Sequence, residues 1–388
     1  MDGNIQNIGQ PIGYISMQKK AKVSVLINNH NYGTYIGDAI ESVLNQSYRN
    51  FELIIVDGAS TDESRKIIMS YVERFPDLIT AVFKPSSGQA AAINVGFQLS
   101  RGDIIAFLDS DDYFYENKLE RIVSLHEQYD FVGNARKALN YRKELTDVIA
   151  PADEYEQRPL LFHKYGYIYT YNLITSCISA KRELLTKILP MPEEDYITFA
   201  DCYVKVMAQY YSNIKYLNEP LTFYRIHDLQ ETLSFDNFLK LNQFVERLYD
   251  RVFRDINCVL QERGEEVIPP LNAENFKQAF AIANPKADIR EGENYVIFGA
   301  GNNSYKVQKY LKLLGGKCLY MVDSNPKKWG MLWNDISVIS FDELVKKRSE
   351  FHKIIIASPY FREMEQTLFD LGMKSDIDFI TIQSFPND

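Results

Sequence analysis

The stretch Gly102-Asp103-Ile104-Ile105-Ala106-Phe107-Leu108-Asp109-Ser110-Asp111-Asp112 decides how this sequence of 388 residues is interpreted. Five apolar residues follow a Gly-Asp pair and end at three carboxylates, which predicts a short buried strand with acidic side chains at its carboxyl end. Like charges this close repel one another, so the cluster is expected to hold a divalent cation. Carboxylate oxygens suit Mg²⁺ or Mn²⁺, which usually also bind the phosphates of a substrate. The alternative is a solvated acidic turn, because short motifs match by chance.

Strand and helix patterns alternate four times around this stretch. Each predicted strand is followed by a segment with apolar residues at helical spacing, and Ser60 or Thr61 is expected to cap the second of these helices. Short connections between such elements give right-handed βαβ units and a mostly parallel sheet with flanking helices. The strands are predicted at 23–27, 52–56, 79–83 and 104–108.

Ligands of such sheets bind beyond the carboxyl ends of the strands. Asp57 and the acidic cluster at 109–112 both follow a predicted strand directly. We therefore expect them to share one cleft, which favours a functional interpretation of both.

Composition and charge limit the class of protein. A hydrophobic fraction of 46% and a charged fraction of 24% are ordinary for a globular protein, and the length allows two or three domains. The 26 Tyr and 23 Phe residues provide aromatic surfaces for packing or for sugar rings. A net charge of −9 without a basic run argues against nucleic acid as a partner.

The cysteines and the hydropathy of the sequence indicate in which cellular compartment the protein is expected. Cys177, Cys202, Cys258 and Cys318 lie far apart without metal or redox spacing, and are expected to be reduced, buried thiols of a cytosolic protein. The sequence predicts neither a signal peptide nor a transmembrane segment, because no apolar run approaches the ~18 residues that a membrane span needs. Peripheral attachment to the inner face of the membrane remains compatible with it.

From Lys22 to about His227 the chain resembles a family 2 glycosyltransferase of the GT-A fold. The matching pieces follow the order of that family and cover a little over half of the chain. They are VSVLINNHN at 23–31, SVLNQSY at 42–48, FELIIVDGASTD at 51–62, AINVGF at 92–97 and the acidic stretch at 102–112. The resemblance implies an α/β GT-A nucleotide-diphospho-sugar transferase fold for this half.

The resemblance also implies a nucleotide site for a UDP- or dTDP-sugar donor. Asp57 would pair with the nucleobase, and the segment with Asn28, His30 and Asn31 would line its pocket. Many members have a second Asp where this chain has Gly58, which is a departure at the base contact. The alternative for Asp57 is a turn carboxylate that caps the following helix.

Asp109 and Asp111 match the DxD motif of the family. Asp111 is expected to bind Mn²⁺ or Mg²⁺ directly, whereas Asp109 would meet the ribose, or the metal through water. The ion would bridge the diphosphate and stabilise the negative charge of the leaving group.

Family 2 enzymes invert the anomeric centre, so a carboxylate must take the proton of the acceptor hydroxyl on the face opposite the diphosphate. Phe199-Ala200-Asp201-Cys202-Tyr203 fits the acidic dipeptide of the family with Ala in place of the usual Glu, and makes Asp201 the expected base. The alternatives are that Asp201 is a helix-capping aspartate, or that Glu194 or Asp195 serves instead.

Three further side chains are candidates for contacts to the nucleotide-sugar or the acceptor. Phe223-Tyr224-Arg225-Ile226-His227 resembles the Tyr-Arg-x-His of the family, and Arg225 and His227 are candidates for contacts to the diphosphate. A lone His is more often structural. Gln89 is a candidate for contacts to donor or acceptor hydroxyls, although helix capping by Ser87 explains its segment equally well.

The sequence predicts four regions: a loose N-terminal arm at 1–20, a GT-A domain at 21–235, a helical bridge or linker at 236–292 and a smaller Rossmann-like α/β domain at 293–388. Within the second of these, alternating patterns at 165–171 and 174–178 predict strands at a sheet edge. Acceptor loops are expected within 150–235.

A glycine motif marks the last region. Gly299 and Gly301 fall between a predicted strand and a helix, and Asp323 follows about twenty residues later, which is the context of a dinucleotide site. The alternative is a structural or homo-oligomerisation domain whose glycines only close a turn.

Three hypotheses result. The leading one is an inverting, metal-dependent glycosyltransferase that acts on a glycan or lipid-linked acceptor in polysaccharide biosynthesis, in the cytoplasm at the membrane face. The second is a non-catalytic sugar-nucleotide binding protein. The third places NAD-linked chemistry in the C-terminal domain.

Overall fold

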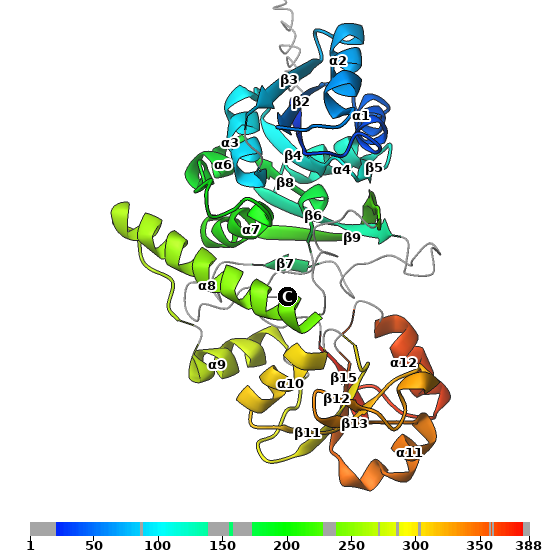
Figure 1. Ribbon diagram of the computed structural model, residues 1–388. Helices are drawn as coiled ribbons and strands as arrows, with labels where there is room; N and C mark the ends of the chain where they lie inside the picture. The colour runs from blue at the N-terminus through cyan, green and yellow to red at the C-terminus, as the bar shows by residue number, and fades with distance from the viewer. Residues whose placement is uncertain are drawn as a thin grey trace, which may run out of the picture.

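A computed structural model describes residues 21–85, 88–138, 155–157, 173–227, 238–270, 272–284, 287–301, 304–356, 358 and 361–382. The predicted N-terminal arm and the alternating pattern at 165–171 lie outside these residues. Within them the chain forms two separate sheets, one of nine strands and one of six (Figure 1).

The predicted alternation of strands and helices is confirmed. Four parallel strands stand in the order β3-β2-β1-β4. They are β1 (Val23–Asn29), β2 (Phe51–Gly58), β3 (Ile79–Lys84) and β4 (Ile104–Asp109), and their helices are α1 (Ile36–Leu44), α2 (Ser64–Arg74), α3 (Gln89–Leu99) and α4 (Lys118–Leu125). The expected cap of α2 is wrong: the helix begins at Ser64, whose N–H donates to Asp62 Oδ1 at 3.0 Å.

The other half of this sheet is mixed. Beyond β4 follow β8 (Ile178–Lys181), β6 (Phe131–Ala138), β9 (Ile214–Tyr224) and β5 (Tyr113–Phe114), while β7 (Tyr155–Gln157) pairs with β9. The edge strand expected at 174–178 is wrong. Thr175–Cys177 is a single 3₁₀ turn, η1, and β8 lies inside the sheet, antiparallel to both β4 and β6. The alternating pattern was misleading because polar and apolar residues alike are buried here, among them Ser176 and Ser179.

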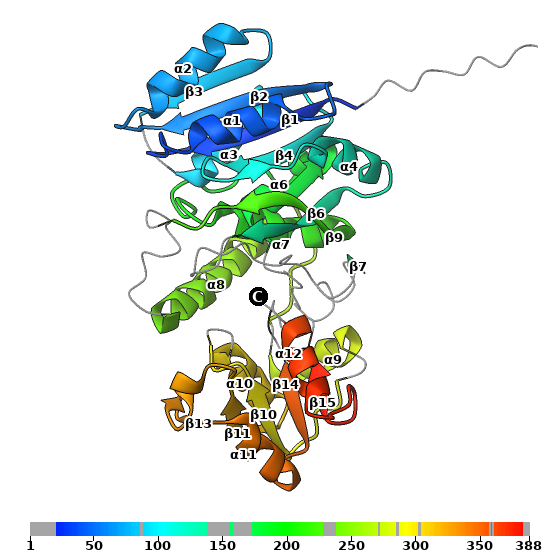
Figure 2. The ribbon, with the colours of Figure 1, turned by 90° about the vertical axis from the view of Figure 1, so that its right-hand side faces the viewer.

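Helices cover both faces of the first sheet (Figure 2). Side chains alternate along β1, so Val25 and Ile27 pack with α1, α2 and α4, whereas Leu26 packs on the other face. On that second face the core includes α3, α6 (Arg182–Ile188), α7 (Ala200–Tyr211) and α8 (Phe238–Glu262). The carboxyl ends of β1, β2 and β4 are therefore held by packing on two sides.

The second sheet has the order β12-β13-β11-β10-β14-β15, parallel except for β12 at its edge. Its strands are β10 (Asn294–Phe298), β11 (Lys317–Val322), β12 (Leu332–Trp333), β13 (Ile336–Ile339), β14 (Lys353–Ile356) and β15 (Phe379–Thr381). Its helices are α10 (Ser304–Leu313), α11 (Phe341–Lys346) and α12 (Phe361–Asp370), and α9 (Ala273–Ala283) packs on it as well. In both views α8 lies between the two sheets.

The four cysteines are free thiols. Cys177 and Cys202 are buried as expected, but Cys258 on α8 is exposed and Cys318 is only partly buried. No helix in the described part of the chain is long and apolar enough to cross a bilayer.

Gly102 opens β4 where the strand passes closest to β1. A Cβ at this position would lie 2.5 Å from Ser24 N and 2.8 Å from Lys22 O, which are backbone atoms fixed by strand pairing. Gly102→Ala should therefore lower the free energy of unfolding by about 1–3 kcal/mol, measured by urea denaturation. Gly37→Ala is the matched control in α1, where the Cβ meets only Tyr71 Oη at 3.9 Å, and it should leave stability unchanged or raise it by up to about 1 kcal/mol. Equal unfolding midpoints for the two variants would contradict this account of β4.

Candidate functional site

One cavity of about 500 Å³ opens at the carboxyl ends of β1 and β4 and is closed by the starts of α3 and α7. It brings together residues that the sequence places up to 196 positions apart, from Asn28 to Tyr224. The predicted site residues that line it are Asn28, His30, Asn31, Gln89, Asp109, Asp111 and Asp201.

The acidic loop at the end of β4 is tied down by backbone and side-chain contacts. Asp109 N donates to Ser176 Oγ at 3.0 Å, and Ser176 Oγ donates to Asp112 Oδ2 at 2.6 Å. Asp112 Oδ1 also accepts from Arg225 N at 3.1 Å. His227 Nε2 lies 3.1 Å from Asp111 Oδ2. Asp112 therefore fixes the loop, whereas Asp109 and Asp111 face the cavity.

Burial disfavours the charged form of these carboxyl groups, and repulsion between them adds to this at Asp109 and Asp112. Burial, with the charge of Asp111, raises the pKa of Asp109 to about 7. Burial also raises the pKa of Asp111, although His227 and Arg225 act in the opposite direction. The pKa of Asp112 is raised well above its usual value by burial and by both neighbours. A cation at this loop would relieve the repulsion.

The loops after β1 and β2 are bonded to each other beside the cavity. His30 Nδ1 lies 2.5 Å from Gly58 O. Asn31, at a left-handed φ of 59°, donates its N–H to Ser60 Oγ at 2.8 Å and accepts from Thr61 N at 2.8 Å. Asparagine tolerates this backbone region better than most residues, which explains its use here. The wall formed by 28–31 is thus rigidly placed.

Asp57 lies behind this wall rather than on it. It is buried, accepts from Asn29 Nδ2 at 2.6 Å and from Ser60 N at 3.1 Å, and is not among the residues that line the cavity. These contacts match the alternative of a turn carboxylate, although the turn it closes follows β2 and is not the cap of α2. A direct contact of Asp57 with a nucleobase stays a prediction.

Asp201 lies in the first turn of α7, two residues after Phe199, whose φ of 58° is unusual for a bulky residue. Asp201 Oδ2 pairs with Lys205 Nζ at 2.7 Å, and Lys205 Nζ also donates to Leu173 O at 2.7 Å. Sequence reasoning missed Lys205, although its spacing of four residues on a helix was a usable signal.

The alternative bases lie elsewhere. Glu194 and Asp195 are exposed and do not line the cavity. Asp195 Oδ1 is instead 3.5 Å from Arg251 Nη1. The geometry therefore favours Asp201 among the three candidates.

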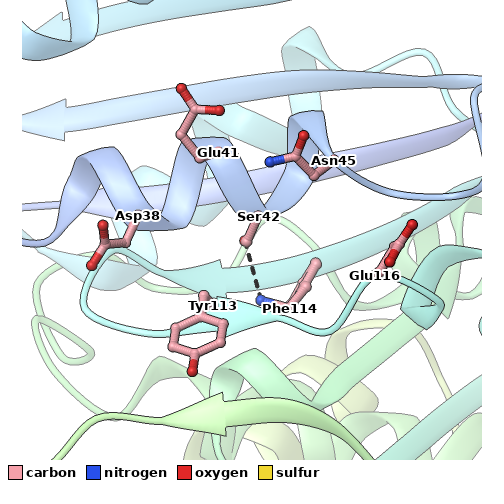
Figure 3. A pocket seen from close by; sticks show the side chains of 7 residues that line it. All are labelled: Asp38, Glu41, Ser42, Asn45, Tyr113, Phe114 and Glu116. Carbon is pink, nitrogen blue, oxygen red and sulfur yellow. Dashed lines mark hydrogen bonds between the residues drawn. The ribbon is translucent and has the colours of Figure 1, made fainter.

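Arg225 joins the site to a second hollow of about 690 Å³ between α1 and β5 (Figure 3). Its Nε donates to Asp111 O at 2.9 Å, and its Nη2 donates to Asp38 Oδ2, which lines that hollow, at 2.7 Å. The guanidinium also lies over the Tyr35 ring at 4.9 Å. Arg225 thus braces the backbone of the acidic loop from behind.

In the second sheet, the turn with the glycine motif is held by hydrogen bonds to the Asp323 carboxylate from groups of the same domain. The buried Asp323 carboxylate accepts from Ala300 N at 2.8 Å, Asn325 N at 2.9 Å and Lys328 Nζ at 2.9 Å. Gly299 has a φ of 102°, which a turn at this point requires. These contacts favour the turn-closing interpretation of Gly299, Gly301 and Asp323 over a ribose site.

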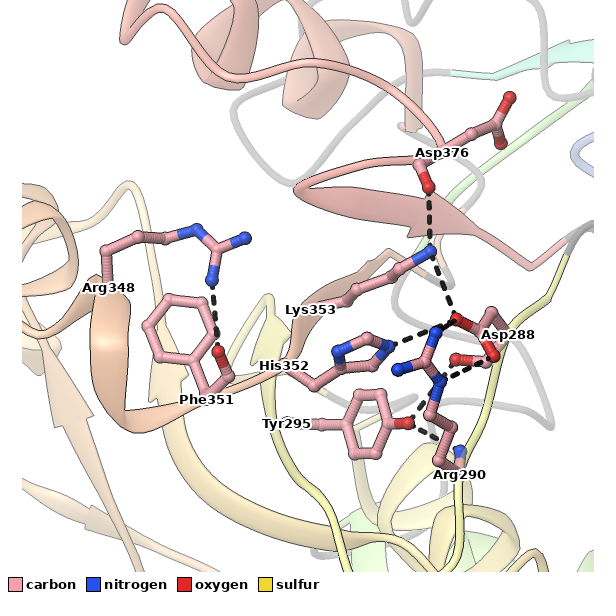
Figure 4. A network of polar contacts seen from close by, with 8 residues as sticks. All are labelled: Asp288, Arg290, Tyr295, Arg348, Phe351, His352, Lys353 and Asp376. Carbon is pink, nitrogen blue, oxygen red and sulfur yellow. Dashed lines mark hydrogen bonds and ion pairs between the residues drawn. The ribbon is translucent and has the colours of Figure 1, made fainter.

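A second polar cluster in this half fixes the path of the chain into β10 (Figure 4). Asp288 is held by Arg290 through contacts of 3.0 Å and 2.6 Å and by His352 at 3.2 Å. Its pKa is lowered, mainly by the hydrogen bonds from Arg290. Lys353 Nζ donates to Asp376 O at 2.7 Å. The contacts of His352 and Lys353 join separate segments of the chain, and those of Arg290 are local, so the cluster has a structural role.

No group of three or more His, Cys, Asp or Glu side chains in the described ranges is arranged as a ready-made metal site. Asp109 and Asp111 nevertheless line the cavity with hard oxygen donors, and His227 Nε2 lies 3.1 Å from Asp111 Oδ2. Mg²⁺ commonly takes only one or two carboxylates from a protein and completes its shell with phosphates and water. The donor set therefore fits a cation that arrives with a diphosphate.

Stability of the metal-free protein should depend on pH through Asp109. Because its pKa is raised to about 7, the folded protein holds a proton that the unfolded chain loses near its usual value of 3.8. Folding is thus favoured at low pH, and this contribution, on the order of 2–4 kcal/mol, is lost as the pH rises through about 7. Urea unfolding in EDTA around pH 5 and around pH 7.5 should show a smaller decline for Asp109→Asn than for wild type or the exposed Asp77→Asn. Identical declines would refute the assignment.

Comparison with known proteins agrees with these observations. The model of the glycosyl transferase family 2 matches residues 24–189. An uncharacterized glycosyltransferase of Nostoc sp. is 34% identical over 55% of this chain and 67% of its own length, and one of Haemophilus influenzae is 30% identical over 53% and 79%. The crystal structure of S. aureus TarS 1-349 in complex with UDP-GlcNAc is 18% identical with a TM-score of 0.49, covering 68% of this chain and 72% of that one. The predicted family and the α/β fold class with its mostly parallel sheet are confirmed, and the chain belongs to glycosyl transferase family 2.

Proposed function

We propose that this chain is an inverting, metal-assisted glycosyltransferase that moves a sugar from a UDP- or dTDP-sugar to a hydroxyl of a glycan or lipid-linked acceptor. Family membership makes it a transferase that uses a nucleotide-sugar donor. The single observation that carries the finer proposal is that the acidic loop of β4 and Asp201 of α7 line one cavity from different elements. Inverting transfer needs the metal-binding carboxylates and the base to come from different sides of the cavity, because the leaving group and the base act on opposite faces of the sugar.

The donor nucleotide is assigned to the wall formed by 28–31. His30 offers a ring face and Asn28 and Asn31 offer amide groups, all of which line the cavity. Asp57 would act through Asn29, whose Nδ2 it holds at 2.6 Å, and not by direct contact. With Gly58 in place of a second carboxylate, this wall would carry the recognition of the base.

The diphosphate is assigned to the acidic loop. Asp111, with Asp109 and His227 beside it, would hold Mn²⁺ or Mg²⁺. The pKa values of the Asp109 and Asp111 carboxyl groups are raised, and their oxygens are donor atoms that fit such an ion. When bound, the ion supplies Lewis-acid stabilisation of the departing diphosphate. Arg225 holds the loop backbone in place through Asp111 O.

Asp201 is assigned as the base. Its Oδ2 is paired with Lys205, which leaves Oδ1 to take the proton of the acceptor hydroxyl. As that proton leaves, the hydroxyl oxygen bonds to the anomeric carbon, and the bond from this carbon to the diphosphate oxygen breaks. Lys205 keeps a positive charge beside the carboxylate, because Asp201 and its other neighbours raise its pKa against the effect of burial.

The acceptor is assigned to the side of the cavity next to Asp201. Ile174, Ile197 and Phe199 line it there, and Ile197 is 56% exposed. This apolar rim suits the carbon faces of a sugar or a lipid-linked glycan in polysaccharide biosynthesis. In the same proposal, the enzyme acts in the cytoplasm at the inner face of the membrane. It would form a homo-oligomer through its C-terminal Rossmann-like domain.

The two other hypotheses have less support. A non-catalytic binding protein would have no use for a buried Asp201–Lys205 pair at the cavity, since burying two charges is costly. NAD-linked chemistry would need the Asp323 carboxylate for ribose, but it is already bonded to Ala300, Asn325 and Lys328.

Asp201→Asn should lower kcat by about 10²- to 10⁴-fold while the KM for the donor changes little, because the variant loses the proton acceptor but keeps the donor site. Turnover of labelled UDP- and dTDP-sugars with Mn²⁺ across an acceptor panel would measure it. Asp195→Asn is the matched control and should retain the wild-type rate, since its carboxylate lies outside the cavity. A fully active Asp201→Asn variant would rule out this base.

Asp111→Ala should reduce turnover by about 10²-fold or more, because stabilisation of the leaving group is lost. EDTA should abolish wild-type turnover and Mn²⁺ should restore it. The exposed Asp77→Ala, with the same loss of a carboxylate, should behave as wild type. Turnover that persists unchanged in EDTA would contradict the metal assignment.

A further inference from the structure

The side chain of Gln89, the first residue of α3, bridges the two halves of the cavity. Its Nε2 donates to Asp109 Oδ1 at 3.2 Å and to Thr175 Oγ1 at 3.0 Å. Its Oε1 accepts from Ala200 N at 2.8 Å. One amide group therefore touches both the acidic loop and the residue that precedes Asp201.

Backbone contacts at the same point strengthen the bridge. Gln89 N donates to Ile197 O at 2.7 Å and Ala90 N donates to Tyr196 O at 3.1 Å. These are N–H groups of the first turn of α3, which have no partner inside their own helix. The loop before α7 thus caps α3, and the side chain of Gln89 in turn caps α7.

Phe199, which lies between Ile197 and Ala200, has a strained backbone conformation. Phe199 holds a φ of 58° directly before Ala200, and such a backbone persists only where its surroundings enforce it. Its ring packs on Phe244 of α8 at 5.4 Å. The bond from Ala200 N to Gln89 and this packing fix the point at which α7 starts, and hence the place of Asp201.

We infer that Gln89 is a positioning residue that links the acidic loop to the helix of the base, so that a cation bound at Asp109 and Asp111 tightens the placement of Asp201. This inference rests on the proposed function. It departs from the expectation that Gln89 contacts donor or acceptor hydroxyls. Both N–H groups of its amide are already used, and its carbonyl has accepted one hydrogen bond, so it has no donor left for a ligand.

Three variants separate these roles. Gln89→Met removes every side-chain hydrogen bond at similar size. Gln89→Glu keeps an acceptor for Ala200 N but loses both donors. Gln98→Met places the same change at an exposed position of α3 and serves as the control.

Hydrogen exchange of the peptide that covers 199–203 provides a readout independent of turnover. In wild type, Mn²⁺ added together with UDP should slow exchange there by about threefold or more, relative to UDP without Mn²⁺. Gln89→Met should exchange faster and lose the response to Mn²⁺, Gln89→Glu should keep the protection but lose the response, and Gln98→Met should match wild type. Unchanged exchange in Gln89→Met would overturn the inference.

Kinetics then test positioning against the other roles. Gln89→Met should lower kcat about 10- to 100-fold with the donor KM within about threefold of wild type, and this loss should largely vanish in an Asp201→Asn background. A raised donor KM with unchanged kcat would make Gln89 a donor ligand, and a lower Tm without a kinetic effect would make it merely structural. Either result overturns the inference. If wild type transfers no sugar at all, the proposed function fails, while the exchange experiment still decides the role of Gln89.

Discussion

Three carboxylates at the end of one buried strand are the constraint on which the rest of this structure depends. Burial raises the pKa values of Asp109, Asp111 and Asp112, and repulsion between the carboxylates adds to this at Asp109 and Asp112, so the loop is costly to keep charged. Among the described residues, His227 and Arg225 act to lower the pKa of Asp111 but do not offset the effect of burial there. Lys118 lies buried nearby, but burial lowers its pKa to about 7, and its ammonium group is bonded to Ser176 O and Thr222 Oγ1. Buried carboxylates whose charge is not compensated mark a candidate ligand site. A cation that binds there would supply the missing positive charge, and this interaction would favour its binding.

The surrounding elements hold the loop in that state instead of relaxing it. Ser176 in η1 donates to Asp112 and accepts from Asp109 N, which is possible because β8 runs antiparallel beside β4 and brings η1 to its carboxyl end. Arg225 at the end of β9 braces the same loop through its backbone. The mixed half of the first sheet thus supports the loop, whereas the parallel half carries the wall formed by 28–31.

Much of this could be predicted from sequence where the signal is local. The strand before Asp109 is a run of β-branched and aromatic residues bounded by turns, so its existence and its acidic end followed from the pattern alone. The position of β8 did not follow, because alternation suits a half-buried edge strand and 175–180 is buried throughout. Likewise, the pattern placed Asp57 after a strand and Gln89 at the start of a helix. It did not show that Asn29 donates to Asp57 or that Ala200 N donates to Gln89, since those partners come from distant parts of the chain. Contacts of this kind depend on the tertiary fold.

The two α/β units obey the same rule, that carboxylates at strand ends mark a site, and yet they differ in how those carboxylates are satisfied. Asp323 follows β11 as Asp109 ends β4, but it is paired with Lys328 and two backbone N–H groups. Its hydrogen-bonding capacity is used within the domain, so a ligand would have to break those bonds and expose Lys328 before binding. At Asp109 and Asp111 a ligand cation would instead relieve repulsion that already exists. The degree to which a strand-end carboxylate is already satisfied, more than the motif around it, therefore separates the unit with the candidate site from the one whose glycines close a turn.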